Sequence, residues 1–139
     1  MRHIEPFEIV TCSTKNGTCT TVTRTQWREL KTKMGTEEEL RGSSNVIERE
    51  RDFIGIGHFQ DGRRYSFFWF SFTKSLPFTI KSASKPFRMT EPNGRQFISS
   101  LAAVDDWYLI SFTVEDETSQ WKWFLRSEVD LRINEITRN

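Results

Sequence analysis

The chain has 139 residues, with 20 Lys or Arg against 19 Asp or Glu, and a net charge of +1 at pH 7. This balance argues against a nucleic-acid partner, which normally selects a strongly basic protein, and against an acidic tail protein. No apolar run approaches the roughly 18 residues of a membrane-spanning helix, so we expect no membrane span.

Aromatic residues make up 14% of the chain, although hydrophobic residues in total make up only 36%. Ala occurs three times, whereas Ser and Thr together occur 28 times. Aromatic and β-branched residues fit pleated sheets, and Ala favours helices. We therefore predict an all-β fold whose core is built mainly from rings.

Residues 1–24 are predicted to contain a β-hairpin. Two β-prone runs flank Asn16-Gly17, a dipeptide favoured where both turn residues need a positive φ. Cys12 and Cys19 fall on the two arms, where a cross-strand disulfide is within reach if the register is right. Two reduced thiols are the alternative. No signal peptide is visible, so the compartment is cytoplasmic by default and secretory if the disulfide forms.

Residues 25–39 are predicted to form one short helix, near residues 25–35, or an irregular loop. Trp27, Leu30 and Met34 follow the i, i+3, i+7 spacing of one helix face. Strand patterns dominate the remainder of the chain, beginning at residue 40.

Residues 40–90 are predicted to hold short strands, including an Asp61-Gly62 hairpin turn. Residues 91–126 are predicted to hold a second set, and residues 127–139 a charged tail with a helical pattern. A period of about 40–50 residues with four strands in each is typical of propeller blades. A single β-sandwich has the same strand spacing and is the alternative, and either way we treat residues 1–139 as one domain.

The sequence offers few residues for metal or cofactor chemistry. It contains two His, no glycine-rich phosphate loop and no Cys/His zinc spacing, so we expect no cofactor and no metal site. His58 follows Gly55-Ile56-Gly57, where glycines allow another backbone or a ligand to approach closely. His58 either lines a site or ends a strand at a turn.

Three other polar residues are candidates for a binding site. Asp116, between two Glu residues, either points into a pocket or belongs to a solvated turn. Arg41 and Ser43 could line a polar cavity, although Arg41 could instead pair with the acidic run 37–39. Trp121 and Trp123 share one strand face, where we favour core packing over a sugar-stacking platform.

Five short segments occur in a recognisable order: 40–47 with Arg41-Gly42-Ser43-Ser44, 54–58 ending in His58, 77–87, 96–101, and 109–116 ending in Asp116. This order resembles the later blades of five-bladed β-propellers related to glycoside hydrolases of family 130, the β-mannoside phosphorylases. It also resembles the propeller domains found alongside bacterial and viral glycosyltransferases. The resemblance covers most of the chain from residue 40 to residue 125.

The resemblance implies a partial propeller of two to three blades that binds or acts on carbohydrate or sugar phosphate. In this arrangement His58 contacts substrate or phosphate, Arg41 and Ser43 lie near the funnel, and Asp116 faces the central pocket. The segment that holds the family's proton-donating Asp has no counterpart, so phosphorolysis by this chain alone is not expected, and its being an enzyme is left open.

Two blades with open edges would need missing blades or a homo-oligomer to cover them. The alternative function is a non-enzymatic β-sandwich module for protein interaction.

Overall fold

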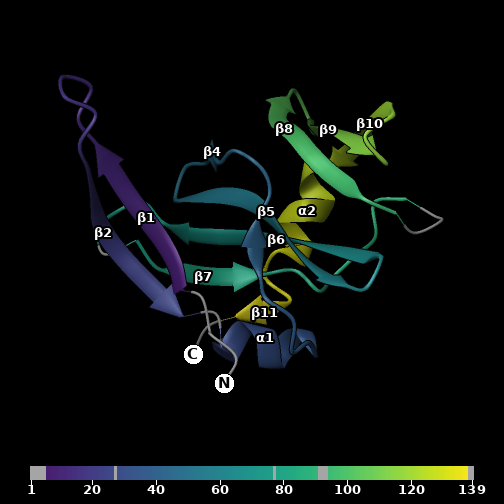
Figure 1. Ribbon diagram of the computed structural model, residues 1–139, viewed down its shortest axis with the longest axis horizontal. Helices are drawn as coiled ribbons and strands as arrows, with labels where there is room; N and C mark the ends of the chain where they lie inside the picture. Colours follow the sequence, from purple (N-terminus) through teal and green to yellow (C-terminus); the bar gives the residue numbers. More distant parts are fainter. Residues whose placement is uncertain (1–5, 27, 77, 91–93, 138–139) are drawn as a thin grey trace.

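The computed structural model describes residues 6–26, 28–76, 78–90 and 94–137 of the chain. Most of these residues lie in antiparallel strands, so the all-β prediction is confirmed (Figure 1). The helix predicted near residues 25–35 is α1 (Arg28–Met34). Trp27, part of the pattern that predicted it, lies outside the described residues. No helix within the described ranges has the length and apolar character needed to cross a membrane.

A two-stranded hairpin of β1 (Pro6–Cys12) and β2 (Cys19–Gln26) projects from the rest of the molecule (Figure 1). Gly17 at its tip has the predicted positive φ, 69°, whereas the φ of Asn16 is not positive, so the turn differs from one in which both residues have a positive φ. Cys12 and Cys19 lie directly opposite each other and form a disulfide, with their Cα atoms 4.0 Å apart. Of the two states that the sequence allows, the structure contains the bonded one.

The larger sheet has the strand order β11-β7-β6-β5-β3, and β4 also pairs with β5. Its strands are β3 (Arg41–Gly42), β4 (Ile47–Glu48), β5 (Asp52–Asp61), β6 (Arg64–Thr73), β7 (Ile80–Ala83) and β11 (Ile136–Thr137). The turn between β5 and β6 contains Gly62 with a φ of 59°, which confirms the predicted Asp61-Gly62 hairpin. β11 comes from the predicted tail, so the end of the chain adds an edge strand to this sheet.

The smaller sheet has the order β10-β9-β8 and joins strands that follow one another in sequence. These are β8 (Gln96–Val104), β9 (Trp107–Val114) and β10 (Thr118–Leu125), followed directly by α2 (Arg126–Arg132). The boundary between the predicted segments 40–90 and 91–126 therefore falls between the two sheets.

The main core lies between the two sheets and α2. Trp69 of β6 is almost fully buried, and its ring centroid lies 5.4 Å from that of Tyr108 on β9 and 5.7 Å from that of Phe124 on β10. Val129 and Ile133 close this core from the α2 side. Each such aromatic pair contributes about 0.5–1.5 kcal/mol beyond the burial of its area.

A second core covers the opposite face of the larger sheet. Phe68, Phe70 and Phe72 of β6 are buried there, and Leu30 and Met34 of α1 pack against them. The aromatic run of β6 over residues 67–70 is explained by this arrangement, since a strand covered on both faces favours apolar side chains at successive positions.

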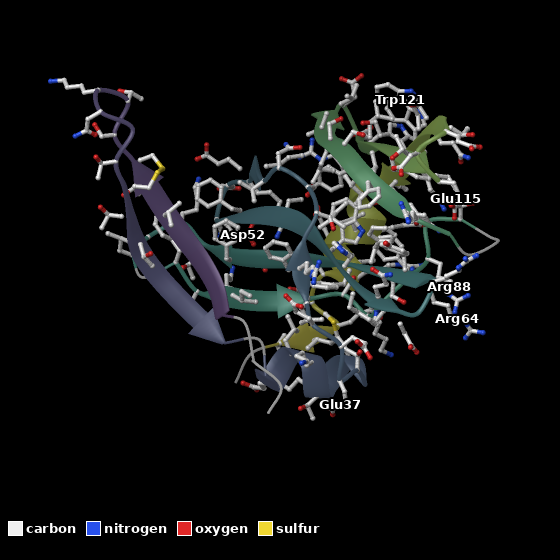
Figure 2. The ribbon with its side chains drawn as sticks, in the orientation of Figure 1. Glu37, Asp52, Arg64, Arg88, Glu115 and Trp121 are labelled. Carbon is white, nitrogen blue, oxygen red and sulfur yellow. A yellow bond between two sulfur atoms is a disulfide. The ribbon has the colours of Figure 1, made fainter. Side chains whose placement is uncertain are left out.

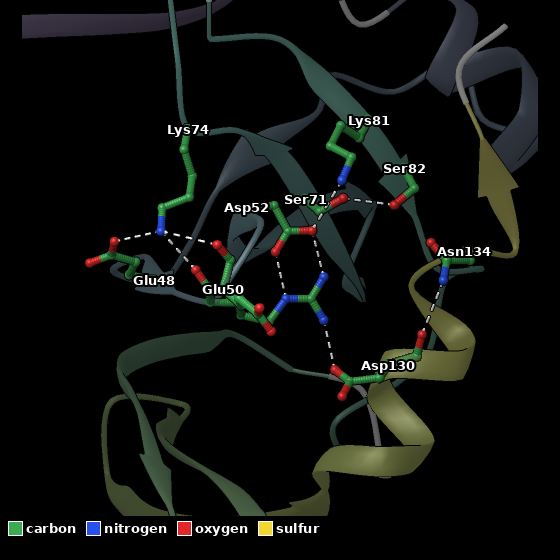
Figure 3. Close-up of polar contacts among 10 residues, drawn as sticks. Glu48, Glu50, Asp52, Ser71, Lys74, Lys81, Ser82, Asp130 and Asn134 are labelled. Carbon is green, nitrogen blue, oxygen red and sulfur yellow. Dashed lines mark hydrogen bonds and ion pairs between the residues drawn. The ribbon is translucent and has the colours of Figure 1, made fainter.

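An ion-pair network joins α2 to the larger sheet (Figure 3). The Arg49 guanidinium donates two hydrogen bonds of 2.6 Å to the carboxylate of Asp52 and one of 2.7 Å to Asp130 of α2. The hydrogen bonds to Asp52 raise the pKa of Arg49 above its ordinary value. Because Asp52 is buried and Asp130 is half exposed, the network runs from the sheet out to the surface of α2.

Candidate functional site

Strands β3 and β5 bring three of the predicted site residues together. Arg41 is the antiparallel partner of His58, and the next pair is Gly42 with Gly57. The Ser43 N–H donates a 2.9 Å hydrogen bond to the Ile56 carbonyl, which places the Ser43 hydroxyl beside the imidazole of His58. Ser43 Oγ and His58 Nδ1 are in hydrogen-bond contact.

Gly57 makes this close approach of β3 and β5 feasible. A Cβ atom added at Gly57 would overlap the ring of Phe68 and lie 2.9 Å from the carbonyl oxygen of Arg41. The prediction that the glycines before His58 admit another backbone is therefore confirmed at Gly57, whereas the atoms nearest an added Cβ at Gly55 belong to side chains. Any larger residue at this position would push β3 away from β5, and Arg41 and Ser43 with it.

An open hollow of about 340 Å³ lies at these strands. Its lining consists of polar or charged side chains and one glycine: Glu38, Glu39, Arg41, His58, Gln60 and Gly62. The Arg41 guanidinium lies 3.0 Å from the Glu39 carboxylate, so the ion pair with the acidic run 37–39 forms at the rim of the hollow. Arg41 thus does both things that the sequence suggested for it: it lines the hollow, and it forms an ion pair with the acidic run.

The surroundings of His58 favour its neutral form. The ring is half-buried and stacks on Tyr65 at a centroid distance of 5.9 Å. Burial lowers the pKa of His58 below 6.5, the neighbouring Arg41 lowers it further, and Glu39 partly offsets both. With Nδ1 occupied by Ser43, Nε2 is the ring atom left to donate or accept one hydrogen bond to a ligand.

Asp116, the fourth predicted residue, lies on the turn between β9 and β10 of the other sheet. It has a φ of 60°, its side chain is 60% exposed, and its carboxylate lies 3.7 Å from the Arg95 guanidinium. Asp116 is not among the residues that line the hollow. Asp116 therefore belongs to a solvated turn, the alternative to a pocket residue in the sequence-based interpretation.

Three side chains that line the hollow, those of Glu38, Glu39 and Gln60, were not predicted from the sequence as binding residues. Gln60 lies two positions after His58 on β5, so the alternation of strand side chains places both on one face. Glu38 carries no comparable local signal, because the segment before β3 is irregular and only the tertiary structure brings it to the hollow.

The outer face of the smaller sheet carries exposed tryptophans, and here the prediction of core packing was wrong. Trp121 is 65% exposed, Trp123 51% and Trp107 42% (Figure 2 shows Trp121). The inner face of this sheet supplies its core residues, and no element of the described chain shields the outer one. We call the exposed residues Trp107, Trp121 and Trp123 the tryptophan face.

The tryptophan face contains an open hollow of its own. Trp107 and Trp123 lie edge to face, with ring centroids 6.4 Å apart, and together with Val104 and Asp105 they line about 440 Å³. Carboxylates stand at both ends of the sheet, at Asp105 and Asp106 on one turn and at 115–117 on the other.

Across the residues that the structure describes, no group of three His, Cys, Asp or Glu side chains could hold a metal ion. Comparison of the chain with protein-family models, with curated proteins and with solved structures gives no significant match.

Proposed function

We propose that this domain binds carbohydrate, and that the sugar site is the hollow beside β3 and β5. The observation that carries the proposal is the contact between Ser43 and His58, with Arg41 paired opposite His58 and all three at one edge of the larger sheet. The resemblance of these segments to carbohydrate-active propellers supports the same assignment.

The chemistry of the hollow matches a ligand with many hydroxyl groups. Each sugar hydroxyl both donates and accepts a hydrogen bond. The carboxylates of Glu38 and Glu39 can only accept, the guanidinium of Arg41 can only donate, and neutral His58 can do either at Nε2. Two carboxylates against one guanidinium disfavour a phosphate, so the proposed ligand is a neutral sugar rather than a sugar phosphate.

The role proposed for the site is binding. The hollow is open to solvent, and the chain has no counterpart of the proton-donating Asp of the propellers that it resembles. The contact between Ser43 and His58 orients the imidazole ring toward a ligand, which reduces the conformational entropy lost on binding.

Calorimetric titration of the full chain with neutral mannose- and glucose-based oligosaccharides tests the proposal. Ser43→Ala, which frees the His58 ring, should weaken binding by about fivefold. Ser99→Ala, on an exposed position of β8, is the matched control and should bind as the wild type does. Absence of binding by the wild type, or equal binding by both variants, would overturn the assignment.

A second candidate function is a protein-interaction module, and the tryptophan face favours it. Three large rings exposed on one sheet face are typical of an interface rather than of a bare surface. We propose that the occupant is a further β-sheet, as a neighbouring blade would supply. A second copy of this chain is disfavoured as the occupant. Both ends of the smaller sheet carry carboxylates, so two copies packed face to face would bring like charges together.

Sedimentation of the isolated chain separates these alternatives. The proposed foreign partner predicts that the wild type and Trp121→Ser both sediment as monomers and bind oligosaccharide equally. A stable dimer that Trp121→Ser dissociates would identify the occupant as a second copy instead. A monomer with no tendency to associate, and with oligosaccharide binding abolished by Trp121→Ser, would assign the tryptophan face to sugar stacking.

A further inference from the structure

A third cleft, of about 230 Å³, lies where the larger sheet, β10 and α2 meet. Trp69 and Val129, both buried, belong to its lining. Phe87 and Phe124 supply aromatic walls, with their ring centroids 5.6 Å apart. The cleft shares no residue with the hollow at His58 or with the tryptophan face.

Charge distinguishes this cleft from the hollow at His58. Four cationic side chains line it, Lys85, Arg88, Lys122 and Arg132, against one carboxylate, that of Glu128. Cationic side chains therefore predominate in the lining. The cations come from distant parts of the chain, from the segment after β7, from β10 and from the end of α2, so the fold itself concentrates them.

Two contacts hold the ammonium group of Lys122 in place. Its Nζ donates a 2.8 Å hydrogen bond to the carbonyl of Met89 and lies 5.7 Å from the centre of the Phe124 ring. The side chain is partly buried, and no carboxylate within the described ranges forms an ion pair with it. A carbonyl and a ring hold the ammonium group in place without neutralising it, so its charge is available to attract an anion.

We propose that this cleft binds a small organic anion, consisting of a phosphate, sulfate or carboxylate group on a ring of about monosaccharide size. The excess of cations selects the anionic group, and the walls of Phe87 and Phe124 provide contact for the apolar side of the ring. The volume of about 230 Å³ admits one such ring. This site is independent of the proposed sugar site, where carboxylates predominate.

Titration of the full chain with glucose 6-phosphate, glucuronate, inorganic phosphate and glucose, followed by NMR, tests the proposal. Glucose 6-phosphate and glucuronate should bind about tenfold more tightly than phosphate or glucose alone, because each combines the charge with the ring. Their binding should weaken as ionic strength rises. Equal binding of inorganic phosphate or of glucose, or no binding of either ring anion, would overturn the proposal.

Substitutions at exposed positions test the cleft without disturbing the fold. The double variant Lys85→Gln/Arg132→Gln should lose about tenfold in affinity for the ring anions, and Glu128→Gln should gain about twofold. Lys15→Gln/Arg63→Gln removes the same charge from two exposed positions outside the cleft and should bind as the wild type does. An equal loss of affinity in both double variants would show that only the net charge of the protein matters, and it would overturn the proposed site.

His58→Gln keeps the two sites distinguishable. It should leave the binding of glucose 6-phosphate unchanged, since His58 does not line this cleft. Loss of anion binding in His58→Gln would show that the anion binds in the hollow at His58, and it would contradict the proposed cleft.

Discussion

The hydroxyl of Ser43 contacts Nδ1 of His58 although 15 residues separate them in the sequence. The contact exists because Arg41 pairs with His58 across two antiparallel strands, which brings the next segment of chain over the ring. One ring nitrogen is thereby occupied before any ligand arrives. The protonation state of His58 then decides what the other nitrogen can do.

The first prediction concerns pH. The lowered pKa of His58 means that, just below pH 6.5, the unfolded chain binds more protons than the folded one. Stability rises with pH wherever the unfolded state binds more protons, so the free energy of unfolding should fall as the pH drops through this window. Urea unfolding of the wild type and of His58→Gln, between about pH 5 and about pH 8, measures how the free energy of unfolding changes with pH.

The variant should lose less stability on acidification than the wild type, because Gln does not titrate. Parallel losses in the two proteins would contradict a depressed pKa at His58.

The second prediction concerns the two glycines that face each other at the site. Gly57→Ala should destabilise the fold by about 1–3 kcal/mol and displace β3, because the added methyl group meets Phe68 and the Arg41 backbone. Its register partner Gly42 has no atom within 4 Å of an added Cβ, so Gly42→Ala is the control and should change stability by less than about 0.5 kcal/mol. Thermal unfolding compares them, and similar melting temperatures would contradict the packing described.

The third prediction concerns the ion-pair network. Asp52→Asn leaves the partly buried Arg49 without its bidentate partner and should cost about 3 kcal/mol of stability. Asp130→Asn removes a half-exposed carboxylate from the same guanidinium and should cost less than about 1 kcal/mol. Denaturant unfolding gives both values. Equal costs would show that burial does not set the strength of the network.

The fourth prediction concerns the hairpin. Replacing both Cys12 and Cys19 by Ser should lower the free energy of unfolding of the hairpin, residues 6–26, by about 2 kcal/mol, since the disulfide closes a short loop. The two sheets should keep their stability, because the hairpin projects from them (Figure 1). Hydrogen exchange resolved by segment measures the effect. Faster exchange throughout the chain, rather than in the hairpin alone, would contradict this independence.

Local patterns predicted much of the secondary structure. The Asn16-Gly17 and Asp61-Gly62 turns occur where expected, because their glycines adopt the positive φ that these turns require. The strand Arg64–Thr73 follows from its aromatic, β-prone residues, and the helix over Arg28–Met34 is one of the two states predicted for residues 25–39, the other being an irregular loop. Each of these features depends on residues close together in the chain, which sequence patterns describe directly.

The candidate site was predictable only in part. Arg41, Ser43 and His58 were identified as candidates, but their convergence depends on the pairing of β3 with β5. Asp116 has the same polar character and lies in the other sheet. The cationic cleft had no sequence signal, since Lys85, Lys122 and Arg132 come from separate segments.

The sequence by itself determined that the chain folds as antiparallel sheets with an aromatic core. Its composition and its turn dipeptides leave few helical segments. The tertiary structure alone decided which aromatic residues belong to the core. Trp69 and Trp121 have the same chemistry and the same strand setting, yet one is buried between two sheets and the other faces solvent. The physical reason is that burial depends on what packs against a face, and that partner comes from elsewhere in the chain.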